Sequence, residues 1–96
     1  MSVSRTVPIT NKRGLHARAS AKFVQLAGQQ PCEVHVTRAG ADGNAGGETV
    51  TGTSIMGLMM LGAAMGDSIV ITANGDGAQG SVDAMAELVE AKFGED

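Results

Sequence analysis

A histidine stands between a turn and a predicted helix in the stretch NKRGLHARAS, residues 11–20. Serine, threonine, aspartate and asparagine are the usual residues at the position that caps a helix start, and histidine ranks below them. A helix beginning after His16 leaves the N–H groups of Ala17 and Arg18 without intrahelical partners, at the positive end of the helix dipole. Arg18 adds guanidinium donors, and Arg13 adds a nearby positive charge. Together these groups predict an anion site suited to phosphate.

The imidazole of His16 gives this predicted site a possible nucleophile. A neutral imidazole is nucleophilic, and beside a phosphate site it is a candidate for covalent phosphoryl transfer. Gly14 favours this interpretation because a glycine allows close approach of the backbone or unusual dihedral angles. Two other interpretations stay open from the residues alone: a solvent-exposed histidine at the end of a loop, and a small domain in which the histidine has no chemical role.

Composition excludes several classes of protein. The chain has 96 residues and a net charge of -3, so it offers no basic field for nucleic acid or anionic lipid. The single cysteine, Cys32, cannot form an internal disulfide, and Cys32, His16 and His35 lack the spacing of zinc ligands. We find no signal-peptide pattern and no apolar run of the roughly 20 residues that cross a bilayer. We expect one cytoplasmic domain over residues 1–96, without a metal ion or organic cofactor.

The periodicity of apolar residues predicts an α+β domain in which one sheet is covered by helices on one face. It predicts strands at residues 3–9, 32–37, 48–51 and 67–73. It predicts a helix that starts at Ala17 and stops at Gly28, with Ala17, Ala21, Val24 and Gly28 on one face and Phe23, Leu26 and Ala27 near it. It also predicts a short helix after Ser54 and a last amphipathic helix with a shared apolar face of Val82, Met85, Ala86, Val89 and Phe93. Residues 39–47 are rich in glycine and predict a mobile loop longer than a tight hairpin needs.

The short helix carries more apolar residues than it can bury. Ser54 precedes it and is a typical capping residue. We expect Leu58 and Leu61 to face the core and Met56 and Met59 to face outward, forming an apolar patch beside His16. An adaptable patch of methionine suits a protein that meets several partners in turn.

The segments GLHARASAKFVQLA and TGTSIMGLMMLGAAMGDSIVITANGDGAQGSVDAMAEL resemble the histidine-containing phosphocarrier (HPr) family of the bacterial phosphotransferase system. The resemblance covers nearly the whole chain, and G-L-H-A-R paired with S-I-M-G is a specific combination. It implies an HPr-like open-faced β-sandwich, with a four-stranded antiparallel sheet and three helices on one face. His16 matches the histidine phosphorylated on Nδ1, Arg18 the arginine that orients the phosphate, and Ser54 a regulatory phosphorylation site. Ile55, Met56 and Met59 match the apolar surface that docks partners.

The resemblance implies a carrier that accepts phosphate from phospho-enzyme I and passes it to an EIIA-type protein, with HPr kinase/phosphorylase as a further partner of Ser54. Such a carrier is a stoichiometric relay rather than an enzyme with turnover, and we expect it to be a monomer that contacts neither nucleic acid nor membrane. Ala19 departs from the proline usual in the sugar branch and is similar to nitrogen-branch paralogues (NPr), although HPr proteins of some lineages also carry alanine. A nitrogen-branch regulatory module, which acts through phosphorylation-dependent protein binding, is therefore the alternative. The acidic tail at residues 93–96 predicts no role in the site.

Overall fold

The computed structural model describes residues 2–40 and 45–95. Its elements are β1 (Ser2–Pro8), α1 (Ala17–Ala27), β2 (Val34–Ala39), β3 (Ala45–Thr51), α2 (Ile55–Met60), β4 (Ser68–Asn74), α3 (Ala78–Glu90) and the 3₁₀ turn η1 (Lys92–Gly94). The strands form a four-stranded sheet in the order β1-β4-β2-β3, in which every neighbouring pair is antiparallel. The predicted order of elements and the α+β architecture are confirmed.

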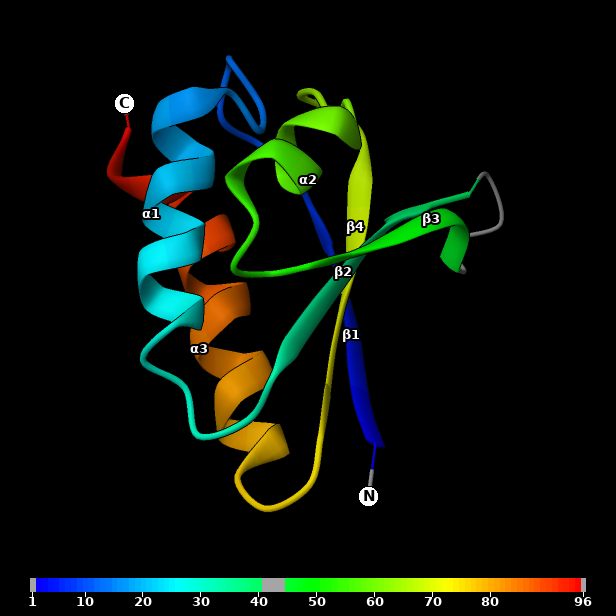
Figure 1. Cartoon of the computed structure of the whole chain (residues 1–96). Helices are drawn as coiled ribbons and strands as arrows, with labels where there is room; N and C mark the ends of the chain where they lie inside the picture. The colour runs from blue at the N-terminus through cyan, green and yellow to red at the C-terminus, as the bar shows by residue number, and fades with distance from the viewer. Residues whose placement is uncertain (1, 41–44, 96) are drawn as a thin grey trace.

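The helices form a second layer against the sheet. α1 and α3 run side by side along it, while α2 lies beside the first turns of α1 (Figure 1). α3 packs on β1 and β4, and α2 contacts α1 and β3. None of the helices in residues 2–40 and 45–95 is long and apolar enough to cross a membrane.

The core lies between the two layers. Its largest fully buried side chains come from the sheet, from all three helices and from η1: Val7, Val36, Ile69, Ile71, Phe23, Leu58, Val82, Met85, Val89 and Phe93. Burial of these side chains is the main force that holds the layers together. The predicted buried face of α3 is confirmed for Val82, Met85, Ala86 and Val89. Phe93, predicted on the same helix face, is buried too but lies beyond the end of α3, in η1.

The predicted face of α1 is wrong by about one residue position. Ala19, Ser20, Phe23 and Ala27 are the buried residues, whereas Ala17 and Ala21 are exposed. Phe23 decides the orientation, since its ring has more apolar area to bury than the alanines of the competing face. The helix therefore turns Phe23 into the core, and Ala17 faces solvent.

The third strand is longer than its sequence predicts. β3 begins at Ala45, which pairs with Ala39 at the end of β2. Residues 45–47 are thus strand rather than loop, but the register between β2 and β3 shifts between Thr37 and Ala39, so Gly46 and Gly47 lie at an irregularity of the ladder. Glycine in a strand often marks such a bulge. The rest of the predicted loop includes residues 41–44, which lie outside the described residues.

Candidate functional site

His16 occupies the N-cap position of α1, where its backbone is extended at φ -75° and ψ 179°. Its side chain makes no capping hydrogen bond to the helix. The side chain is only 17% exposed, so His16 is not the freely exposed loop histidine of the alternative interpretation.

The first turn of α1 keeps its hydrogen-bond donors free. The first helical bond runs from the N–H of Ser20 to the carbonyl of His16 at 2.9 Å. Within the described part of the chain, the N–H groups of Ala17, Arg18 and Ala19 have no partner. Arg18 is exposed and makes no ion pair with any described residue. The structure thus brings His16, the two predicted amides and a free guanidinium to one helix start, where the dipole favours an anion.

Gly14 holds this junction against the segment that follows α2. Its φ is +62°, and a Cβ atom there would lie 2.6 Å from the carbonyl oxygen of Ala63 and 2.8 Å from the Cα of Ala64. The next residue, Leu15, donates its N–H to the same Ala63 carbonyl at 3.0 Å. A glycine is required here both by the left-handed backbone and by the close approach of two backbones.

The C-terminal tail reaches the site, which the sequence analysis did not predict. Glu95 Oε2 lies 2.6 Å from His16 Nε2, although the two residues are 79 positions apart. Its second carboxylate oxygen, Oε1, accepts a hydrogen bond from Asn11 Nδ2 at 3.0 Å. The hydrogen bonds from His16 and then from Asn11 hold the pKa of Glu95 below its usual value, against an opposing effect of burial. The apolar Phe93 was the only sequence signal that the tail is anchored.

The start of α2 lies near this junction and is built differently. Ser54 is its N-cap, and the side-chain Oγ accepts a hydrogen bond from the N–H of Gly57 at 3.0 Å. The predicted capping role of Ser54 is confirmed. Ser54 is half-buried.

The apolar residues of α2 divide as predicted. Met56 is 71% and Met59 43% exposed, while Leu58 is fully buried and Leu61 packs against the core. Ile55, Met60 and Met65 are exposed as well. We call the exposed set Ile55, Met56, Met59, Met60 and Met65 the apolar patch. The patch flanks Ala63 and Ala64, the residues on which Gly14 packs.

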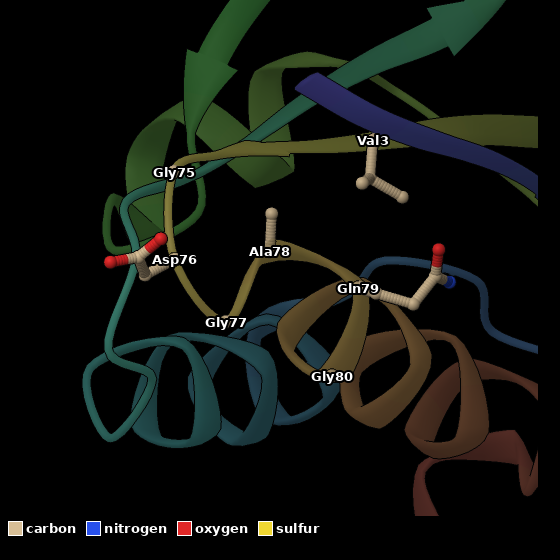
Figure 2. A pocket seen from close by; sticks show the side chains of 7 residues that line it. All are labelled: Val3, Gly75, Asp76, Gly77, Ala78, Gln79 and Gly80. Carbon is tan, nitrogen blue, oxygen red and sulfur yellow. The ribbon is translucent and has the colours of Figure 1, made fainter. Parts of the chain in front are cut away.

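A separate pocket of about 390 Å³ lies at the opposite end of the molecule, lined by Val3 and residues 75–80. Figure 2 shows Val3 of β1 and Ala78 of α3 pointing toward one another across it. The nearby Cys32 is buried and donates its thiol hydrogen to the carbonyl of Asp76 at 2.8 Å. None of the predicted site residues lines this pocket.

Comparisons with known proteins agree with this architecture. A family model described as "PTS HPr component phosphorylation site" matches residues 3–91. The chain is 41% identical to the phosphocarrier protein HPr of Cupriavidus necator, over 97% of each chain, and 37% identical to the phosphocarrier protein NPr of Shewanella violacea, over 97% of this chain and 94% of that one.

Solved structures give the same result. The HPr of Thermoanaerobacter tengcongensis superposes with a TM-score of 0.82 at 37% identity, covering 98% of both chains. A dimeric form of that HPr superposes with a TM-score of 0.69, covering 93% of this chain and 94% of the other. With the same sheet, the same three helices and sequence similarity along nearly its whole length, the chain belongs to the HPr phosphocarrier family of the phosphotransferase system.

Proposed function

We propose that this protein is a phosphocarrier in which His16 accepts phosphate from phospho-enzyme I and passes it to an EIIA-type protein. One observation supports this most directly: the side chain of His16 stands at a helix start whose first three N–H groups have no hydrogen-bond partner among residues 2–40 and 45–95. Those amides, the helix dipole and the guanidinium of Arg18 are the groups that stabilise a phosphoryl group in transfer. Membership of the HPr family supports the proposed direction of transfer, from enzyme I to the EIIA-type protein.

The proposed site holds phosphate with moderate strength. Its donors are a few amides and one exposed guanidinium. A carrier must release what it accepts, and tight binding of the ground state would slow that release without speeding the chemistry. We therefore propose a stoichiometric relay in the cytoplasm, with no cofactor in the transfer.

Partner docking is assigned to the apolar patch, above all to Ile55, Met56 and Met59. These side chains are exposed, although burial would favour them by about 1.5–3 kcal/mol each, and flexible methionine adapts to different surfaces. A phosphate on Ser54, added by HPr kinase/phosphorylase, would sit at the edge of this patch, where a helix start tolerates it. Its charge would then repel an acidic partner without unfolding the domain. Light scattering tests the expected monomer, since a related HPr also forms a dimer.

Labelling with enzyme I and radioactive phosphoenolpyruvate tests the proposal. We expect an acid-labile label on the wild-type protein and none on His16→Ala. His35→Ala is the matched control, because His35 is a half-buried histidine on the sheet that pairs with Glu33 at 3.2 Å. We expect it to be labelled normally. Normal labelling of His16→Ala would overturn the proposal.

A regulatory module of the nitrogen branch is the second candidate. The similarity to an NPr protein and the alanine at position 19 favour it. Incubation with purified enzymes I of both branches separates the two candidates. Fast labelling by the sugar-branch enzyme, followed by delivery to a sugar-specific EIIA protein, supports the carrier. Labelling only by the nitrogen-branch enzyme, without delivery to a sugar acceptor, supports the regulatory module.

A further inference from the structure

The contact between Glu95 and His16 belongs to a longer chain of hydrogen bonds. Asn11 Nδ2 donates to the carbonyl of Gly14 at 2.9 Å and to Glu95 Oε1 at 3.0 Å, and Glu95 Oε2 lies 2.6 Å from His16 Nε2. Asn11 is fully buried, and the side chains of His16 and Glu95 are 17% and 19% exposed. Four groups in series, largely shielded from water, fix one another's orientation.

Tertiary packing brings the tail into this position. Phe93 is fully buried, and Lys22 Nζ of α1 donates to its carbonyl oxygen at 2.6 Å. Lys92 and Phe93 both have positive φ values, 57° and 55°, which turn the chain back toward the start of α1. Such a conformation is unfavourable for residues other than glycine, so packing of Phe93 must compensate for it. The position of Glu95 is therefore built into the fold.

Asn11 sets the direction of every hydrogen bond in the series. Both hydrogens of its amide nitrogen are used, one by the Gly14 carbonyl and one by Glu95. A carboxylate only accepts hydrogen bonds. Nε2 of His16 must then carry the proton that Glu95 accepts, which leaves the lone pair of a neutral ring on Nδ1.

We propose that Glu95, oriented by Asn11, is a positioning residue that makes Nδ1 of His16 the phosphorylated nitrogen and stabilises the ring once the phosphate is attached. This inference rests on the proposed function. When the Nδ1 lone pair forms a bond to phosphorus, the bond to the donor's leaving atom breaks and its electron pair stays with the donor. The ring keeps its Nε2 proton and becomes positively charged beside the carboxylate. Onward transfer returns the electron pair to Nδ1 and restores the neutral ring, so no proton has to enter or leave.

Two substitutions of Glu95 separate positioning from mere packing. Glu95→Ala removes the acceptor and should leave a mixture of the two ring tautomers. Glu95→Gln should reverse the tautomer. With Asn11 held by Gly14, the glutamine must turn its oxygen to Asn11 and its NH₂ group to Nε2, which then has to accept. An amide in place of an orienting carboxylate selects the wrong tautomer by the same logic in serine proteases.

The tautomer is measured by ¹⁵N NMR of the imidazole in unphosphorylated protein. We expect an Nε2–H ring in the wild type, a mixture in Glu95→Ala and an Nδ1–H ring in Glu95→Gln. Glu87→Gln is the matched control, because it removes the same charge from an exposed position of α3. It should leave the tautomer unchanged. An Nδ1–H ring in the wild type, or the wild-type tautomer in both Glu95 variants, would overturn the proposal.

Rates of phosphorylation by enzyme I give the second readout. We expect kcat to fall by about tenfold in Glu95→Ala and further in Glu95→Gln, with KM unchanged, because one hydrogen bond to a charged group is lost and docking is not. Equal rates in Glu95→Gln and the wild type would also contradict the proposal. If the wild type takes up no phosphate, the proposed function fails, while the tautomer measurement still decides the role of Glu95.

Discussion

The starts of α1 and α2 differ in how the N-cap side chain treats the N–H groups of the first turn. α2 is capped by its own N-cap side chain, since Ser54 Oγ accepts the N–H of Gly57. α1 has an imidazole at the equivalent position, which makes no bond to its helix and instead contacts Glu95 of the tail. A helix start has four N–H groups without intrahelical partners, and an N-cap side chain satisfies one or two of them.

The two helices also differ in how much they depend on a cap. α2 is short, and its cap stabilises it. α1 has 11 residues and is held by buried Ala19, Phe23 and Ala27, so it needs a cap less. The N–H groups of its first turn stay available for a ligand. The comparison therefore supports the proposed anion binding at the start of α1, and it gives the side chain of Ser54 a capping role at the start of α2.

The strongest effect is expected where the turn before α1 contacts the segment that follows α2. Gly14→Ala should lower the free energy of unfolding by about 2–5 kcal/mol, because a left-handed alanine adds to a clash with the backbone of Ala63. Gly62→Ala is the control: its φ is +67°, but a Cβ there meets nothing within 4 Å. It should cost only about 1–2 kcal/mol. Urea unfolding measures both, and equal losses would show that the close approach to Ala63 is unimportant.

The contribution of Arg18 at the start of α1 can be tested in the same way. Arg18→Ala should slow phosphorylation of His16 by about tenfold or more, because it removes a charge-assisted hydrogen bond to the transferring phosphoryl group. Lys12→Ala removes an equal charge from an exposed position in the preceding turn and should change the initial rate much less. Rapid-quench kinetics with enzyme I compare the two variants. Equal slowing would indicate a general effect of charge rather than a specific contact.

A pair of variants at Ser54 separates the cap from the surface. Ser54→Ala should cost about 1 kcal/mol of stability, because the N–H of Gly57 loses its partner, while phosphorylation of His16 continues at the normal rate. Ser54→Asp keeps a capping oxygen and adds charge. It should leave the melting temperature nearly unchanged and slow transfer from enzyme I. If Ser54→Asp lost stability and rate together, regulation through docking would be wrong.

Glu95 in the tail should make a small, pH-dependent contribution to the free energy of unfolding. The pKa of Glu95 is held below its usual value of 4.5 by hydrogen bonds from His16 and Asn11, and Lys22 adds a nearby positive charge. A group whose pKa is lower in the folded state contributes stability above its unfolded value and loses it as the pH falls through the folded value. The wild type should therefore exceed Glu95→Gln in stability at pH 5, with the difference shrinking below about pH 4.5. Urea unfolding across this range measures it, and the same trend in Glu87→Gln would contradict the assignment.

Local sequence predicted most of the elements because their apolar periods are clear. The alternation in β1, the run Ile69–Val70–Ile71 in β4 and the face Val82–Met85–Ala86–Val89 in α3 all appear where the pattern predicts them. The start of β3 was missed, since its glycines favour a loop and the strand reaches back to Ala45 only through the pairing of that residue with Ala39 of β2. The face of α1 was missed as well, because small alanines surround it and only packing of Phe23 selects its orientation.

The residues that predict a site at the start of α1 are close together in the sequence: Gly14, His16 at the N-cap position and Arg18 are all local features. The surroundings of the imidazole depend on tertiary packing. The contact with Glu95 spans 79 positions and arises because buried Phe93 and the bond from Lys22 anchor the tail beside α1. Contacts of this kind leave no periodic trace in a sequence, since they depend on how separate elements pack rather than on the conformation of any one of them.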